Sequence, residues 1–201
     1  MRKYQHLSTR YVYDRIRVLV DNKISANKPW LTAESVRLLN NLLSPDDEML
    51  EVGSGKSTLW FAERVALLHS LEDNQHWFNK VTTLLNRNNF NQTVKYELLA
   101  ADETYSQKMT SLDKKYDVIL VDAGDRGKCA LQSLKMVRAN GILIIDNANW
   151  YLPSPHHAPE SFRNATQIQD PDWLKFYDST SHLRCIQTTN GIADTFIYFA
   201  A

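Results

Sequence analysis

Short apolar runs alternate along the chain with longer segments that have the periodicity of helices. Runs of strand length lie at residues 49–52, 67–71, 94–99, 116–121 and 141–145. Helical patterns lie between several of them, at residues 58–66, 77–85 and 128–138. The stretches 118–121 and 142–145 are almost entirely aliphatic, which is typical of central strands covered on both faces. The alternation predicts βαβ units and a parallel sheet.

Two helical patterns precede the first of these runs. Residues 9–24 place apolar side chains on one side of a helix, and we expect this side to pack on another part of the protein. These side chains are Tyr11, Val12, Ile16, Leu19 and Val20. Residues 31–43 have a second helical pattern, with Thr32 as its cap. One domain is predicted for residues 1–201, with N-terminal helices at 1–45 and an α/β core at 46–201.

The C-terminal part of the chain departs from the alternation. Residues 172–177 have a short helical pattern, and strand-like runs at 183–186 and 195–199 flank Asn190-Gly191. Asn-Gly is a dipeptide of tight turns, so these two runs predict an antiparallel hairpin that closes the sheet. The whole pattern predicts an α/β fold, with a doubly wound, mostly parallel sheet of seven strands and a C-terminal antiparallel hairpin.

Composition and charge exclude several classes of protein. Basic and acidic residues number 23 each among 201, so the formal net charge is +0, and we expect no nucleic-acid partner. The two cysteines, Cys129 and Cys185, form no pair typical of a zinc site or a disulfide scaffold, which favours a reducing compartment. The first residues lack the apolar core of a signal peptide, and no apolar run reaches the roughly 18 residues of a membrane span. A cytoplasmic protein is therefore expected.

Polar residues, many of them acidic, follow the five predicted parallel strands. Because ligands bind beyond the carboxyl ends of such strands, these residues are the candidates for a functional site. Strand by strand they are Glu51-Val52-Gly53-Ser54-Gly55, Glu72-Asp73, Ala101-Asp102-Glu103, Asp122-Ala123-Gly124-Asp125 and Asp146-Asn147-Ala148-Asn149.

The glycine-containing loop at residues 53–58 has two functional interpretations. Gly55-Lys56-Ser57 imitates the end of a phosphate-binding P-loop, which predicts a nucleotide hydrolase. That motif needs another glycine five positions before Gly55, where Leu50 stands inside the predicted strand. Carboxylates gathered at the same edge would also repel phosphate, whereas they favour a cationic or hydroxyl-rich ligand.

The second interpretation rests on a family resemblance. Residues 49–55 match the first motif of class I S-adenosylmethionine-dependent methyltransferases, apolar-apolar-acidic-apolar-Gly-x-Gly, and the loop looks like the subgroup with Gly-Ser-Gly-x-Ser-Thr. The resemblance covers about residues 30 to 150 and implies a Rossmann-like fold with S-adenosylmethionine as cofactor. It implies that Glu72 binds the ribose and that Asp102 lies near the adenine amino group. The full implied cofactor set is Glu51, Gly53, Ser54, Gly55, Ser57, Glu72, Asp102 and Asp122.

A narrower resemblance concerns the acceptor side. Asp122 and the pair Asp146-Asn147 are similar to the metal-binding trio of catechol-type O-methyltransferases, which implies Mg²⁺ and makes these three the candidate catalytic residues. The lysine which that family carries shortly after its metal aspartate is absent here, and Arg126 lies in that neighbourhood. The alternative is that Asp122 and Asp146 cap helices or orient the substrate, and we expect Arg126 to pair with Asp122.

The function expected is methyl transfer to a small or medium-sized acceptor, with an oxygen acceptor favoured over nitrogen. The N-terminal helices and residues 148–170 are expected to form the acceptor pocket. Two alternatives from other classes stay open. They are the nucleotide hydrolase and a nonenzymatic domain that binds S-adenosylmethionine or a partner.

Overall fold

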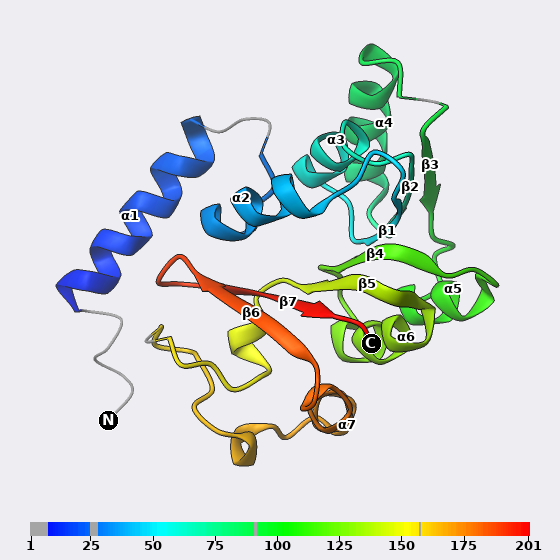
Figure 1. Ribbon diagram of the computed structural model, residues 1–201. Helices are drawn as coiled ribbons and strands as arrows, with labels where there is room; N and C mark the ends of the chain where they lie inside the picture. Colours follow the sequence, from blue (N-terminus) through cyan, green and yellow to red (C-terminus); the bar gives the residue numbers. More distant parts are fainter. Residues whose placement is uncertain (1–7, 25–27, 91, 157) are drawn as a thin grey trace.

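Seven strands form one mixed sheet in a computed structural model that describes residues 8–24, 28–90, 92–156 and 158–201. The strands are β1 (Glu48–Val52), β2 (Leu67–Glu72), β3 (Val94–Leu98), β4 (Tyr116–Val121), β5 (Val137–Ile145), β6 (Arg184–Thr189) and β7 (Asp194–Phe199). Their order is β3-β2-β1-β4-β5-β7-β6. Strands β1 to β5 run parallel to one another, and β7 runs antiparallel to β5 and β6. The predicted fold class is confirmed (Figure 1).

Helices cover both faces of the sheet (Figure 1). On one face lie α2 (Ala33–Leu42), α3 (Lys56–Ala62) and α4 (Gln75–Arg87), and on the other α5 (Tyr105–Ser111), α6 (Arg126–Met136) and α7 (Pro171–Thr180). The alternation of a strand's side chains divides the core accordingly. Met49 and Leu120 belong to the cluster under α2–α4, whereas Leu50 and Val121 belong to the one under α5–α7.

Helix α1 (Thr9–Ile24) contradicts one expectation. Its apolar side was expected to pack on another part of the protein, but Val12, Ile16, Leu19 and Val20 are 46–59% exposed. Figure 1 shows α1 outside the layers of helices that cover the sheet, and Tyr11 and Asp14 of this helix are half-buried. Amphipathic periodicity predicts the helix but does not say what covers its apolar side.

Within the described residues, no helix is both long and apolar enough to cross a membrane.

Some element boundaries differ from the predicted ones. Helix α5 had no predicted counterpart, since it is short and buries only Tyr105 and Met109, too few positions for a periodic signal. Strand β5 begins at Val137 rather than at residue 141, because its pairing with β4 changes register after Tyr116 and thereby extends the strand. The hairpin at Asn190-Gly191 is confirmed: β6 and β7 pair through Thr189 and Asp194.

The chain reverses its direction of winding at β1, and this creates a crevice. From β1 the sheet extends through β2 to β3 on one side, and through β4 to β5 on the other. Gly53 leaves β1 with a φ of +94°, and a Cβ there would collide with the backbone carbonyl of Asp122. Only glycine combines this conformation with so close an approach of the two strand ends. Open α/β sheets bind ligands at such a switch point.

Candidate functional site

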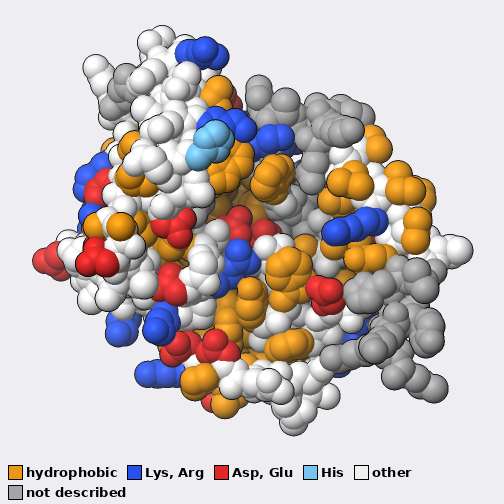
Figure 2. Space-filling model, turned by 180° about the vertical axis from the view of Figure 1, so that it is seen from behind, with side chains coloured by type: hydrophobic (Ala, Val, Ile, Leu, Met, Phe, Trp, Pro, Cys, Tyr) orange, Lys and Arg blue, Asp and Glu red, His pale blue; other side chains and the backbone are white. Residues whose placement is uncertain are grey.

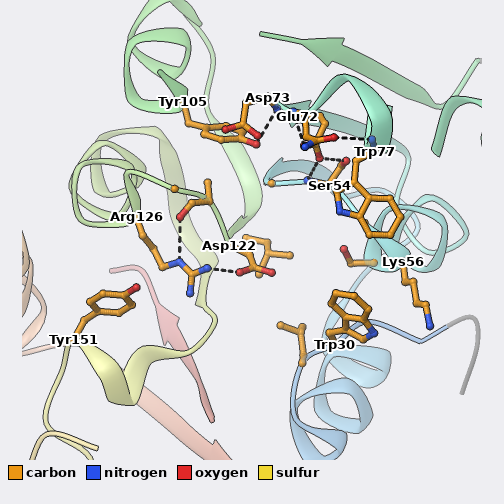
Figure 3. A pocket seen from close by; sticks show the side chains of 18 residues that line it. Trp30, Ser54, Lys56, Glu72, Asp73, Trp77, Tyr105, Asp122, Arg126 and Tyr151 are labelled. Atoms are coloured by element: carbon orange, nitrogen blue, oxygen red, sulfur yellow. Dashed lines mark hydrogen bonds and ion pairs between the residues drawn. The ribbon is translucent and has the colours of Figure 1, made fainter. Parts of the chain in front are cut away.

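A cavity of about 570 Å³ opens at the carboxyl ends of β1, β2 and β4 (Figure 3). Its size is that of a pocket for a small molecule or cofactor. Six predicted cofactor residues line it: Gly53, Ser54, Gly55, Ser57, Glu72 and Asp122. In Figure 3, Trp30 and Trp77 stand on one side of the cavity and Arg126 with Tyr151 on the other, with Asp122 between them.

The glycine loop is held in place by hydrogen bonds to Glu72. The backbone N–H of Ser54 donates to Oε2 of Glu72 at 3.2 Å, and the Ser54 hydroxyl donates to the same oxygen. The other oxygen of Glu72 accepts from the backbone N–H of Asn74 at 2.9 Å, at the start of α4. Glu72 therefore joins the loop after β1 to the helix after β2.

Glu72 retains the capacity to bind a ligand. Glu72 is only 3% exposed, but it lines the cavity. A carboxylate has about four lone-pair sites, and the three hydrogen bonds from Ser54 and Asn74 use three of them. Burial raises the pKa of Glu72, while the bonds from Ser54 and Asn74 lower it. A ligand hydroxyl is therefore a suitable partner for the remaining lone pair. The ribose of S-adenosylmethionine carries such hydroxyls, so Glu72 fits this part of the cofactor.

Two predicted cofactor residues lie away from the cavity lining. Glu51 is completely buried, and its Oε2 accepts from Thr58 Oγ1 at 2.7 Å and from Ser70 Oγ at 2.5 Å. Asp102 is exposed in the turn after β3. The cofactor roles of both residues stay predictions. Asp73 lines the cavity, and the pair Glu72-Asp73 at the end of β2 was the signal in the sequence that pointed to it.

Glu51 is connected to the glycine loop through hydrogen bonds of Thr58. Since Thr58 donates to Glu51, its hydroxyl oxygen is oriented to accept the N–H of Gly55 at 3.1 Å. Oε1 of Glu51 has no hydrogen-bond partner within the described part of the chain. Burial raises the pKa of Glu51 to about 7, against hydrogen bonds from Ser57, Ser70 and Thr58 that lower it.

The acidic trio predicted for the acceptor side comes together, but around an arginine. Arg126 begins α6, and the predicted pair with Asp122 is confirmed. The guanidinium also donates from Nη1 to Oδ1 of Asn147 and to the backbone oxygen of Asp146, each at 2.9 Å. Asp122 and Arg126 line the cavity, whereas Asp146 and Asn147 lie behind them. The catalytic roles predicted for Asp122, Asp146 and Asn147 stay predictions.

One carboxyl oxygen of Asp146 is bonded to a residue outside this cluster. Asp146 is 5% exposed, and its Oδ1 accepts from Thr195 Oγ1 at 3.0 Å. Burial, followed by the charge of Asp122, raises its pKa to about 7, although Arg126 lowers it. In the described residues no group of three or more His, Cys, Asp or Glu side chains is placed to hold a metal ion. Since Arg126 occupies the space among the predicted ligands, the residues present do not fit Mg²⁺.

Aromatic side chains supply much of the remaining lining. Tyr151 lines the cavity and stacks on Trp173 with ring centroids 4.8 Å apart. Trp77 lines the cavity at the start of α4. The sequence analysis did not identify Trp30, which lines the cavity and is 56% exposed. The centroid of its ring lies 5.6 Å from Nζ of Lys56. Its position just after Pro29, before the start of α2, was the feature of the sequence that could have pointed to it.

The glycine loop does not form a phosphate-binding cradle. Leu50 lies inside β1 and is fully buried, and α3 begins at Lys56, so only Gly53, Ser54 and Gly55 separate the two elements. The N–H groups of Ser54 and Gly55 are bonded to Glu72 and Thr58. A P-loop requires a longer glycine-rich loop with backbone N–H groups that point at the phosphates.

Solved structures of known proteins share this fold. An O-methyltransferase from Bacillus cereus in complex with SAH is 18% identical, covers 94% of this chain and 91% of its own, and superposes with a TM-score of 0.60. The O-methyltransferase TomG from Streptomyces achromogenes, in complex with SAM, is 17% identical, with 94% and 90% covered and a TM-score of 0.60. An rRNA methylase from Streptococcus thermophilus is 11% identical, with 83% and 93% covered and a TM-score of 0.54.

Comparisons of sequence alone find no counterpart: neither a protein-family model nor a curated protein matches the chain. The similarity to solved structures therefore defines the fold class of the chain. The chain has the Rossmann-like fold of methyltransferases.

Proposed function

We propose that the protein binds S-adenosylmethionine in the cavity and transfers its methyl group to an oxygen of a small or medium-sized acceptor. One observation carries this proposal. The Gly53–Ser57 loop, the ribose-type carboxylate Glu72 and the Asp122–Arg126 pair converge on one cavity at the switch point of the sheet. The solved O-methyltransferases that share the fold, two of them bound to SAM or SAH, support the same conclusion.

The cofactor side of the cavity is the side of β1 and β2. The close approach at Gly53 brings the loop backbone against the ligand, and Glu72 accepts hydrogen bonds from the ribose hydroxyls. Trp77 covers the adenine edge. Carboxylates at this edge favour the positive charge of the cofactor and disfavour triphosphate. Glu51 contributes indirectly, through the hydrogen bonds that order Thr58 and Gly55.

The acceptor side is the side of Asp122, Arg126 and Tyr151. S-adenosylmethionine supplies the methyl group, whose bond to sulfur breaks with both electrons left on sulfur while an acceptor oxygen forms the new bond. The enzyme's own task is to hold that oxygen in line and to keep water out. The hydroxyl proton passes to a carboxylate oxygen of Asp122, whose pKa is raised by burial although Arg126 lowers it. Asp146 and Asn147 position the guanidinium of Arg126.

The most direct experiment is calorimetric titration of the purified protein with S-adenosylhomocysteine and, separately, with Mg-ATP. The proposal predicts saturable binding of S-adenosylhomocysteine at one site and none of Mg-ATP. Binding of Mg-ATP alone would instead support the nucleotide hydrolase. Cofactor binding without transfer to any acceptor hydroxyl would leave only the nonenzymatic binding domain.

A variant of Glu72 tests the assignment inside that titration. Glu72→Gln keeps the shape of the side chain but removes its charge and half of its acceptor capacity. The affinity for S-adenosylhomocysteine should fall by about 1–3 kcal/mol, or roughly 5- to 150-fold. Asp178→Asn, an exposed carboxylate of α7, is the control and should bind as the unaltered protein does. Equal affinities of the two variants would remove Glu72 from the cofactor site.

A further inference from the structure

The side chain of Arg126 donates hydrogen bonds to all three residues that were predicted to hold a divalent cation. Its side chain is 13% exposed and makes four hydrogen bonds through its five N–H groups. Nε donates to the carbonyl oxygen of Ala123 at 3.3 Å, Nη1 donates to Asp146 O and Asn147 Oδ1, and Nη2 donates to Asp122 Oδ1. One N–H, on Nη2, is left over.

Three side-chain oxygens of the predicted metal ligands are already engaged. Asp122 Oδ1 and Asn147 Oδ1 accept from Arg126, and Asp146 Oδ1 accepts from Thr195. A divalent ion among these groups would lie within a few ångströms of the guanidinium, and such like charges repel strongly in a partly buried site. A guanidinium keeps its charge in proteins, so the charge cannot be removed to admit the ion.

Arg126 and Asp122 together offer one hydrogen-bond donor and one acceptor, which is what a single hydroxyl group needs. The remaining N–H of Arg126 can donate, and Oδ2 of Asp122 has no hydrogen-bond partner in the residues that the structure describes. A hydroxyl accepts from the first and donates to the second. The Tyr151 ring centroid lies 5.8 Å from Cζ of Arg126, so the atoms attached to that hydroxyl meet an aromatic surface. Figure 3 shows this surface beside the guanidinium.

We propose that Arg126 takes the place of a divalent cation in the acceptor site, so that the cavity binds no such cation and the Asp122–Arg126 pair binds a single aromatic hydroxyl. The part that concerns the acceptor rests on the proposed function. The part that concerns the cation rests on the hydrogen bonds of Arg126 alone.

The first test measures metal binding rather than activity. Mn²⁺ is the probe, because the paramagnetic resonance signal of the free ion disappears when the ion is bound. The unaltered protein, with and without S-adenosylhomocysteine, should leave the signal unchanged, whereas Arg126→Ala should take up about one Mn²⁺. Asp122→Asn added to Arg126→Ala should abolish that uptake.

Two further variants control for charge and for folding. Arg126→Lys keeps a positive charge in place and should bind no Mn²⁺. Arg64→Ala, which removes an arginine stacked on Trp60 outside the cavity, should also bind none. Thermal unfolding shows which variants are folded, and Arg126→Gln, which also removes the charge and should also take up Mn²⁺, replaces Arg126→Ala if that variant is not folded. Stoichiometric Mn²⁺ uptake by the unaltered protein, lost in Asp122→Asn, would overturn the proposal, as would no uptake by folded Arg126→Ala.

The second test concerns the hydroxyl. Protein saturated with S-adenosylhomocysteine is titrated with 2-naphthol, and with naphthalene as the matched ligand that lacks the hydroxyl. We expect 2-naphthol to bind more tightly than naphthalene, and Arg126→Ala to reduce this binding at least tenfold. No preference for 2-naphthol, or equal binding by Arg126→Ala, would overturn the assignment. If S-adenosylhomocysteine itself does not bind, the proposed function fails, whereas the Mn²⁺ result still decides the role of Arg126.

Discussion

At the scale of single residues, Glu51 is a carboxyl group that folding removes completely from water. Its pKa rises from 4.5 to about 7 through burial, so the folded state binds more protons than the unfolded state between these two values. The contribution of Glu51 to the free energy of unfolding is therefore highest below pH 4.5. It falls as the pH rises to about 7 and stays low above it. Asp146, whose pKa also rises to about 7 through burial, contributes in the same direction.

Glu51→Gln should remove part of this loss. Between pH 5 and pH 8 the free energy of unfolding of the unaltered protein should fall more steeply than that of the variant, by about 1–3 kcal/mol. The glutamine oxygen can still accept from Thr58 and Ser70. Urea unfolding at several pH values measures the difference, with Glu63→Gln, an exposed carboxylate, as the control. Parallel pH profiles for Glu51→Gln and the unaltered protein would contradict the assigned pKa.

Gly53 is the residue whose conformation the cavity depends on. Gly53→Ala places a Cβ against the carbonyl of Asp122 at a positive φ, so it should cost more than about 1 kcal/mol of stability and weaken S-adenosylhomocysteine at least tenfold. Gly124→Ala is the matched control: Gly124 also lines the cavity, but a Cβ there meets no neighbouring atom. Thermal unfolding and calorimetry report the two effects. An unchanged Gly53→Ala would show that the strand ends lie farther apart.

At the scale of elements, α1 and α2 look alike in sequence but differ in what surrounds them. Leu39 of α2 is fully buried under the sheet, whereas Leu19 of α1 is 59% exposed. Leu39→Ala should cost about 2–5 kcal/mol, and Leu19→Ala should stay within about 0.5 kcal/mol. Chemical unfolding of the two variants measures this difference. A large loss for Leu19→Ala would mean that α1 packs against another surface in solution.

The elements that the sequence predicted best are those whose pattern records their surroundings. Residues 118–121 of β4 and 142–145 of β5 are aliphatic because both faces of these strands are covered, so their positions followed from composition alone. Helix α5 was missed because two buried residues do not make a period. The apolar side of α1 was misinterpreted because periodicity reports the shape of a helix and not its neighbours.

In the candidate site, too, some features could be predicted from the sequence and others could not. The loop at Gly53 and the carboxylate Glu72 followed from the order of residues at strand ends, because parallel strands bring those ends to one edge. The orientation of the Asp146 carboxyl group and the bonds of Arg126 to Asn147 depend on side-chain packing between β5, β7 and α6, which no local pattern records. The sequence therefore indicated where the site lies better than what occupies its acceptor side.

At the scale of the whole molecule, the surface agrees with a ligand of limited size. Acidic, basic and hydrophobic side chains are interspersed over the face drawn in Figure 2, where no broad area carries a single charge. This matches the formal net charge of +0. The concentrated chemistry lies instead in the cavity, where Glu72, Asp122 and Arg126 meet. An rRNA methylase shares the fold, so the fold by itself does not determine the size of the acceptor.

Hydrogen exchange of the whole chain, with and without saturating S-adenosylhomocysteine and read by mass spectrometry, locates the bound cofactor. We predict slower exchange at the Gly53–Ser57 loop and at Glu72–Trp77, with α1 and β6 unchanged. Because the loop forms one wall of the cavity, a cofactor bound there has to protect it. Exchange left unchanged throughout, or protection confined to segments away from the cavity, would contradict the claim that this cavity is the cofactor site.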